Sequence, residues 1–284
     1  MQLIHDYRND EGLRKSFNEL AVKIFGLDFE SWYKNGFWQD NYTPYSIVED
    51  GKVVSNVSVN TCNMNYRGKI VRLIQLGTVM TDPEYRGRGY ARILMEQIIK
   101  DYEDKVDGIY LWGNDSVVDF YPKFGFKGSE EYQFSKAVDN TGVQTAEPVP
   151  MSSKTDWDKM VSLLENRPQN SAFYMVENTG LYMFYLSQFM QESVFRIGPD
   201  DYAIAEIDGD TLLLHTIIGD ADIDQVISAF GSSLKRVVFC FTPNETAGFE
   251  KSICEEEDRN FFVRGRFFEE TNGDEYMFQE ISHA

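Results

Sequence analysis

The sequence is poor in cysteine, in positive charge and in long apolar runs. Its three cysteines, Cys62, Cys240 and Cys254, are scattered and form no CxxC pair, which argues against a disulfide framework or a zinc site and favours reduced structural thiols. No eighteen apolar residues run together, and the opening MQLIHDYRNDEG carries acids where a signal peptide needs an apolar core. These absences argue against a membrane-spanning helix, and we expect a cytoplasmic protein.

Positive charge is scarce relative to negative charge. The chain has 27 Lys and Arg against 46 Asp and Glu, a formal net charge of -19. The resulting field repels nucleic acid and anionic membranes, so we expect neither as a partner, and it would attract polyamines, aminoglycosides or basic peptides. A demand for solubility explains the same surplus of acids, so charge alone selects no substrate.

Aromatic residues, in contrast, are plentiful at 14% of 284 residues. A disordered or fibrous chain is therefore excluded, and the length suffices for two globular units. Residues 138–154 are polar, contain two prolines and show no periodicity, which is typical of a linker. We predict a catalytic unit at 1–138, a linker at 139–153 and a second unit at 154–284.

The two units show a similar order of apolar patterns. In the first, we predict a helix over 12–26, an antiparallel meander over 45–81, a helix over 90–102, a strand over 108–114, a helix over 116–124 and a strand pair over 125–137. In the second, we predict helices over 156–167, 180–191, 222–230 and 245–253, with strands over 193–198, 202–208, 211–219, 236–242, 260–268 and 275–282. The fold class is α/β (α+β), with mixed, largely antiparallel sheets flanked by helices, in tandem.

A compact basic turn interrupts the acidic chain in TDPEYRGRGYARILMEQIIKDY, residues 81–102. A glycine-rich turn between a strand and a helix presents backbone N–H groups at the positive end of the helix dipole, which suits a phosphate group. The turn lacks the Gly-Lys-Ser/Thr ending of a P-loop, and GRGYAR lacks the third glycine of the dinucleotide fingerprint. Neither nucleotide-binding fold fits.

The turn resembles the phosphate loop of the GNAT superfamily of N-acetyltransferases, whose pattern of Gln or Arg, two residues, Gly, one residue, Gly or Ala is supplied by Arg86, Gly89 and Ala91. A second stretch, GIYLWGNDSVVDFYPKFGF at 108–126, resembles the family's strand ending at an Asn and its Phe-Tyr before Gly-Phe. The two signatures stand in order, separated by a helix and a strand. The resemblance covers roughly residues 3–136, the length expected of one domain.

The resemblance implies an acetyl-coenzyme A-dependent transfer to an amine, without a metal. The backbone of the loop would hold the pyrophosphate, with Gly87 and Gly89 allowing close approach. The cofactor-binding residues it implies are Val79, Thr81, Arg86, Gly87, Arg88, Gly89, Tyr90, Ala91 and Asn114. Tyr121 matches the family tyrosine near the sulfur and is the candidate general acid.

The acceptor side is less defined by the sequence. Trp32, Tyr33, Phe37, Trp38, Asp40 and Tyr42 offer aromatic faces and an acid for a cationic amine, although aromatic packing in a core explains them equally well. Glu49, Asp40 and Asp115 are acids that could accept the amine's proton, but no spacing selects one of them. The substrate is a small-molecule or a peptide amine.

The second unit lacks both signatures, and its histidines, including His215, are isolated in sequence. We therefore predict a degenerate GNAT-like unit without a cofactor site, which supports the first unit, shapes the acceptor cleft or mediates a homodimer. A different class of function remains open, namely an acyl-coenzyme A-binding sensor without turnover. RNA binding through the arginine-glycine turn is disfavoured by the acidic composition.

Overall fold

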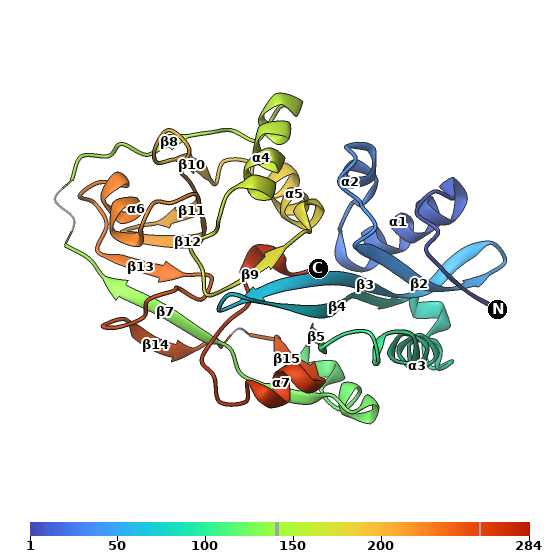
Figure 1. Cartoon of the computed structure of the whole chain (residues 1–284). Coiled ribbons are helices and arrows are strands. Elements are labelled where there is room, and N and C mark those ends of the chain that lie inside the picture. Colours follow the sequence, from blue (N-terminus) through green and yellow to red (C-terminus); the bar gives the residue numbers. More distant parts are fainter. Residues whose placement is uncertain (140–141, 256) are drawn as a thin grey trace.

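The computed structural model describes residues 1–139, 142–255 and 257–284. It contains two mixed, largely antiparallel sheets flanked by helices (Figure 1), which confirms the predicted fold class. The predicted linker at 139–153 includes residues 140 and 141, which lie outside the described residues.

The first sheet holds the predicted meander at its centre. Its strands follow the order β1 (Gln2–His5), β2 (Tyr42–Glu49), β3 (Lys52–Tyr66), β4 (Lys69–Thr81), β5 (Gly108–Gly113), β15 (Asn260–Arg264) and β6 (Lys127–Ser129), and β9 (Phe173–Val176) also pairs with β3. The turns of the meander carry positive φ at Asp50-Gly51 and Arg67-Gly68, as two-residue hairpins with right-handed twist require. Only β4 and β5 are parallel in this sheet.

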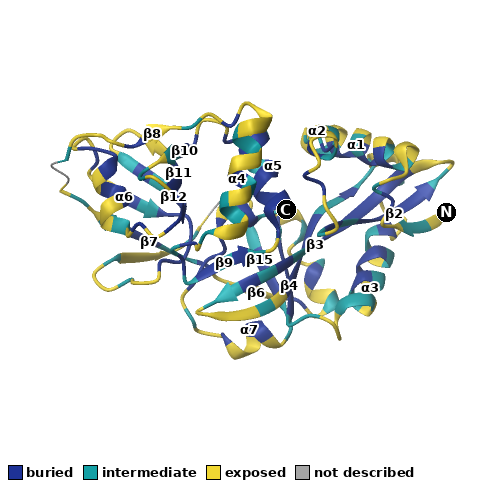
Figure 2. Ribbon diagram, turned by 45° about the horizontal axis from the view of Figure 1, so that its top comes forward, coloured by how far each residue is buried: buried dark blue, intermediate teal, exposed yellow. Residues whose placement is uncertain are grey.

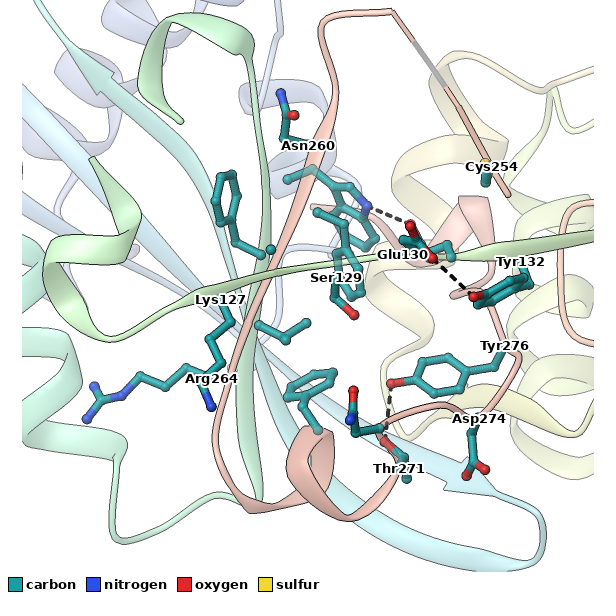
Figure 3. A pocket seen from close by; sticks show the side chains of 18 of the residues that line it. Lys127, Ser129, Glu130, Tyr132, Cys254, Asn260, Arg264, Thr271, Asp274 and Tyr276 are labelled. Carbon is teal, nitrogen blue, oxygen red and sulfur yellow. Dashed lines mark hydrogen bonds between the residues drawn. The ribbon is translucent and has the colours of Figure 1, made fainter. Parts of the chain in front are cut away.

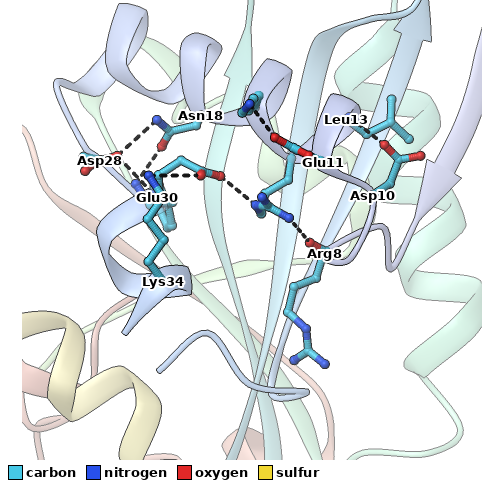
Figure 4. Close-up of polar contacts among 11 residues, drawn as sticks. Arg8, Asp10, Glu11, Leu13, Asn18, Asp28, Glu30 and Lys34 are labelled. Atoms are coloured by element: carbon cyan, nitrogen blue, oxygen red, sulfur yellow. Dashed lines mark hydrogen bonds and ion pairs between the residues drawn. The ribbon is translucent and has the colours of Figure 1, made fainter. Parts of the chain in front are cut away.

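Helices cover both faces of the first sheet. On one face lies α1 (Glu11–Phe25), capped at its start by the Asp10 side chain and ended by Gly26 in the left-handed conformation, and beside it lies α2 (Glu30–Lys34). Polar contacts fasten these two helices: Arg14 Nε donates to Glu30 Oε1 at 2.6 Å, and Asn18 Nδ2 donates to Asp28 Oδ1 at 3.1 Å (Figure 4). On the other face lies α3 (Tyr90–Tyr102), whose buried residues belong to a separate apolar cluster.

The second sheet has a similar arrangement. Its strands follow the order β14 (Glu250–Ile253), β7 (Tyr132–Ala137), β13 (Arg236–Phe239), β12 (Thr211–Ile218), β11 (Tyr202–Asp208), β10 (Val194–Arg196) and β8 (Glu147–Pro148). Strands β12 and β13 are its parallel pair. The second half of the chain also contributes the helices α4 (Lys154–Asn166), α5 (Thr179–Gln188) and α6 (Ile223–Ala229), and a fourth near its end.

The sheets exchange strands between the two halves of the chain. β7, which precedes residue 138, pairs with β13 and β14 in the second sheet. β15 and β9, from the second half, pair with β5 and β3 in the first sheet. The sheets therefore do not divide at the predicted boundary, and the strands of the predicted pair at 125–137 lie in different sheets. Pairing across such sequence distances leaves no local pattern in the sequence.

Several predicted elements are wrong in type. The helix over 116–124 is two 3-10 turns, η2 (Asp115–Val117) and η3 (Tyr121–Phe124), because Pro122 cannot continue an α-helix. The helix over 245–253 is absent, and β14 lies there. The strand over 260–268 ends at Arg264 and continues as α7 (Arg266–Glu270).

The final segment runs through the core without joining a sheet. Residues 276–282 form no strand and include only the 3-10 turn η4 (Glu280–Ser282). Most of their side chains are buried, among them Phe278 and Gln279 at 0% exposure. Buried residues concentrate on the sheets and on the inner faces of the helices (Figure 2). This tail, residues 276–284, therefore packs between the two sheets.

Candidate active site

The basic turn forms the junction between β4 and α3. β4 ends at Thr81, the short 3-10 turn η1 (Pro83–Tyr85) follows, and Gly89 is the N-cap of α3. Gly87 and Gly89 have φ of 77° and 79°, and a Cβ built on either would meet nothing within 4 Å. The backbone conformation, and not contact with other protein atoms, therefore requires glycine at these positions.

The start of α3 presents its amides without a capping side chain. In the described part of the chain, no side chain caps the helix at Gly89. The N–H groups of the first helical turn have no acceptor within a helix. The arginines of the turn are partly engaged: Arg88 lies 3.6 Å from Glu49, and Arg92 lies 3.9 Å from Glu96. The junction is a positive helix end suited to an anion.

β4 and β5 part directly before this junction. The two strands pair only from Leu73 to Gln75 on β4, so residues 76–81 of β4 have no partner on that side. A cavity of about 960 Å³ opens along this gap. The predicted residues that line it are Val79, Thr81, Arg86, Ala91, Asn114 and Tyr121, whereas Gly87, Arg88, Gly89 and Tyr90 do not.

A bulge re-aims the end of β4 beside the cavity. The register between β3 and β4 shifts between Asn56 and Ser58, and Thr78 has a positive φ of 48°. Asn56 Nδ2 donates to the Thr78 carbonyl at 3.0 Å, and the hydroxyls of Tyr42 and Thr78 lie 2.5 Å apart. These contacts hold a backbone conformation that is costly for a β-branched residue. No pattern in residues 52–81 predicts the bulge.

Tyr121 lies on η3 and lines the cavity from the side opposite β4. Its ring packs against Phe120 and Phe262, each at a centroid distance of 5.3 Å, and a Cβ on Gly113 would come within 2.7 Å of it. Burial raises the pKa of the Tyr121 hydroxyl to about 12. The hydroxyl is therefore protonated at neutral pH and able to donate a proton.

Comparison with known proteins agrees with this geometry. Residues 16–128 match the family described as the acetyltransferase (GNAT) domain. The chain carries a GNAT acetyltransferase domain. This confirms the family suggested by the two signatures, whereas the degenerate nature of the second half stays a prediction.

Solved structures share the fold over most of the chain. A probable N-acyltransferase of unknown function from Enterococcus faecalis V583 has a TM-score of 0.61 at 14% identity, covering 93% of this chain and 72% of that one. A GCN5-related N-acetyltransferase from Kribbella flavida has a TM-score of 0.57 at 16% identity, covering 93% and 71%. Eis1 from Mycobacterium abscessus has a TM-score of 0.58 at 11% identity, covering 97% and 76%. The chain is similar to these proteins in fold.

Only part of the aromatic set predicted for the acceptor side lines the cavity. Trp32 and Tyr42 line the cavity. Tyr33, Phe37 and Trp38 do not line it, and they pack in or against the surrounding core. Trp32 and Tyr42 also belong to this core, at 2% and 4% exposure, so the core interpretation holds for all five aromatic residues. Trp32 stacks on Trp38 at 5.6 Å between ring centroids.

None of the predicted acids lines the cavity. Asp40 pairs with Arg8 at 2.6 Å and is 95% exposed, Asp115 accepts from Asn260 at 2.8 Å, and Glu49 accepts from the Tyr90 hydroxyl. Among the described residues that line the cavity there is no Asp or Glu side chain. The sequence positions of these acids, near strand ends, did not indicate where their side chains would lie.

The second half of the chain supplies one wall of the cavity, which sequence reasoning assigned to no particular residue. The contributing residues lie on and directly after α5, directly before β15, and in the tail: Leu181, Phe184, Tyr185, Phe189, Arg259, His283 and Ala284. Gln75 Nε2 donates to the Ala284 oxygen at 3.0 Å, and the Ala284 N–H donates to Gln75 Oε1 at 2.8 Å. The second half of the chain therefore borders this cavity, whereas its predicted role, in support, in shaping an acceptor cleft or in dimerisation, stays a prediction.

The tail sits close to β4 because of a glycine. A Cβ on Gly77 would lie 2.3 Å from the Ala284 oxygen, closer than any such contact in a folded protein. Tyr185 also donates its hydroxyl to the His283 carbonyl at 2.7 Å. A side chain at position 77 would therefore displace the tail from the cavity wall.

A second cavity of about 1100 Å³ lies between β6, β15 and the segment after α7 (Figure 3). Its lining mixes basic and acidic side chains, including Lys127, Glu130 and Asp274. Trp112 and Arg259 border both cavities. The basic turn does not line this second cavity, whereas Arg86 and Ala91 of the turn line the first. No helix in the described part of the chain is both long and apolar enough to cross a membrane.

Proposed function

We propose that this protein is an acetyl-coenzyme A-dependent N-acetyltransferase that acts on a primary amine. The parting of β4 from β5 directly before the α3 junction carries the proposal. The pyrophosphate would bind the amides of residues 86–91, and the pantetheine arm would pair with the free edge of β4 at Val79 and Thr81. Asn114, at the end of β5, lies across the gap and would contact the same arm.

The reaction is a direct transfer. The amine nitrogen attacks the thioester carbonyl, a C–N bond forms, and the C–S bond then breaks. The cavity orients the two reactants, the Val79 N–H would face the carbonyl oxygen, and Tyr121 gives its proton to the departing thiolate. Because the predicted acids lie outside the cavity, the ammonium proton leaves through water in this proposal, and no residue is assigned as base.

The acceptor in this proposal has an apolar body. The cavity wall away from the loop consists of α1, α2 and α5 side chains such as Ile24, Trp32, Phe184 and Phe189. Phe189 is 54% exposed, so an apolar ligand would cover it favourably. A polycation would find no Asp or Glu side chain among the described lining residues to pair with. An arylalkylamine fits this lining better than a polyamine or an aminoglycoside, despite the acidic charge of the whole chain.

Isothermal titration of acetyl-coenzyme A tests the cofactor site. Gly89→Glu should abolish binding, because a carboxylate at the start of α3 repels phosphate and the left-handed conformation is lost. Gly209→Glu is the matched control, since Gly209 also has a positive φ of 61° with nothing within 4 Å but lies in the hairpin between β11 and β12. Failure of the wild type to bind acetyl-coenzyme A would refute the proposal.

Turnover separates the enzyme from a sensor. Acetyl transfer measured by thiol release with phenylethylamine, tryptamine, spermidine, an aminoglycoside and a lysine peptide should favour the first two. Binding of acetyl-coenzyme A without turnover of any amine would favour the acyl-coenzyme A sensor instead.

A further inference from the structure

Three side chains that are isolated in the sequence meet in the second sheet. His215 lies on β12, Cys240 directly follows β13, and Glu280 begins η4. Backbone hydrogen bonds join the three segments: the Cys240 N–H donates to the Leu214 carbonyl at 2.9 Å, and the Glu280 N–H donates to the Cys240 carbonyl at 3.2 Å. One ligand atom from each of the three side chains lies within 4.8 Å of the others. Pairing of the sheet and docking of the tail therefore build the cluster.

The imidazole of His215 is buried between two carboxylates. The residue is 3% exposed, with Nδ1 at 3.0 Å from Glu280 and Nε2 at 3.7 Å from Glu206. Among the described residues neither ring nitrogen has a hydrogen-bond partner of acceptable geometry. A buried polar group is normally hydrogen-bonded, and here two carboxylates lie near the ring without well-aligned hydrogen bonds to it, an arrangement that a metal ion on Nδ1 would satisfy.

The charges around the cluster favour a cation. The Glu280 carboxylate lies 3.0 Å and the Glu206 carboxylate 3.7 Å from the His215 ring, and the Cys240 thiol lies within 4.8 Å of the His215 and Glu280 ligand atoms. A metal ion that binds sulfur would displace the thiol proton to solvent. The cluster and Glu206 would then carry three negative charges, of which a divalent cation balances two.

We propose that His215 Nδ1, Cys240 Sγ and a Glu280 carboxylate oxygen bind a zinc-class divalent metal ion. Zn²⁺ takes nitrogen, sulfur and carboxylate oxygen ligands in a tetrahedral arrangement, with a water in a fourth position where three protein ligands are present. Ligand atoms around such an ion lie roughly 3.5 Å apart, so small side-chain movements close the cluster. Glu206 lies 3.7 Å from Nε2 and would orient the ligating imidazole on closing to hydrogen-bond distance, as carboxylates beside metal-bound histidines do.

The position of the ion assigns it a structural role. None of the three ligands lines the cavity of the GNAT domain. Glu280 stands three residues before His283, whose carbonyl accepts from Tyr185, and four before Ala284, which pairs with Gln75. The ion would anchor the tail to the second sheet and thereby fix one wall of the cavity. This proposal does not depend on the proposed transferase activity.

Titration with Co²⁺ tests the site directly. The full-length chain, treated with a chelator and dialysed, should bind one Co²⁺ per chain with a thiolate-to-metal charge-transfer absorption that Zn²⁺ displaces. Cys240→Ser should abolish that absorption. Glu280→Gln should weaken Co²⁺ binding at least tenfold, and because the Glu280 side chain is 48% exposed this variant should keep the fold. Cys62→Ser, at a buried thiol of the first sheet, is the matched control and should bind as the wild type does.

Thermal unfolding gives a second readout. Zn²⁺ should raise the Tm of the wild type and of Cys62→Ser, because a ligand that binds only the folded state stabilises it, and should leave the Tm of Cys240→Ser unchanged. Absence of stoichiometric Co²⁺ binding by the wild type, or wild-type binding by both Cys240→Ser and Glu280→Gln, would overturn the proposal.

Discussion

Replacing Tyr121 by Phe should remove catalysis and leave the fold intact. The Phe ring keeps the contacts with Phe120 and Phe262, 5.3 Å away in each case. Because no described residue shares a hydrogen bond with the Tyr121 hydroxyl, its removal leaves no protein group unpaired, and we expect the unfolding free energy to change by less than about 1 kcal/mol. A purely structural tyrosine would show an equally small effect on activity.

The catalytic effect should be much larger. Loss of a positioned general acid lowers rates by about 100- to 10,000-fold, equivalent to roughly 3 to 5 kcal/mol of transition-state stabilisation. The effect should fall on kcat, because the thiolate appears only as the C–S bond breaks, whereas the Kd of acetyl-coenzyme A should stay within about twofold of wild type. A large loss of kcat with little loss of unfolding free energy would distinguish a catalytic role of Tyr121 from a packing role.

The assay is a pH profile of acetyl transfer for wild type and Tyr121→Phe, with urea unfolding of both. Since burial raises the pKa of Tyr121 to about 12, its ionisation should cause no decline of the wild-type rate below about pH 11. If the variant retains the wild-type kcat at every pH, Tyr121 is not the general acid. Equal losses of kcat and of stability would assign the residue to packing alone.

Three further outcomes follow from the structure. Gly89→Ala should cost about 1 to 2 kcal/mol of stability, because its φ of 79° is unfavourable for a residue with a Cβ, and urea unfolding measures this. Gly77→Val should displace the tail and raise KM for the amine more than Kd for acetyl-coenzyme A, whereas Gly128→Val, where a Cβ meets nothing within 4 Å, should change neither. Stability should fall as pH rises above about 8.5, because burial raises the folded-state pKa of the Cys62 and Cys240 thiols while the same thiols ionise in the unfolded chain from about pH 8.5. Above about pH 10 it should fall more steeply, because burial also raises the pKa of Tyr121 and Tyr276 to about 12; a Tm that stays constant between pH 8 and pH 11 would contradict this.

The local elements of the GNAT domain were readable from the sequence because their signals are local. Left-handed glycines at positions 51 and 68 mark the hairpins, and the apolar stripe after Gly89 marks α3. Helix α1 was predicted within one residue at each end, because its stripe and its terminal glycine coincide. Such features depend on neighbours a few residues apart, which the chain itself displays.

Pairing between distant segments could not be predicted from the sequence. The run from 260 to 268 has Phe residues on both sides of Arg264-Gly265-Arg266. The approach of Gly265 to Gly108, where a Cβ would lie 2.8 Å from the Gly108 Cα, explains why the chain turns there into α7. The run from 275 to 282 has the composition of a strand, yet the tail finds its partners in side chains such as Tyr182 and Thr242. Tertiary context overrides propensity in both places.

The sequence by itself determined the class of chemistry, because the loop at 86–91 and the stretch through Tyr121 are short motifs whose residues act through their own backbone and side chains. The tertiary structure alone decided which residues surround the acceptor. It brought α5 and the tail against β4, left Asp40 and Glu49 outside the cavity, and gathered His215 with Cys240 and Glu280. Contacts of this kind depend on sheet pairing and packing over more than a hundred residues of chain, for which a single sequence carries no local signal.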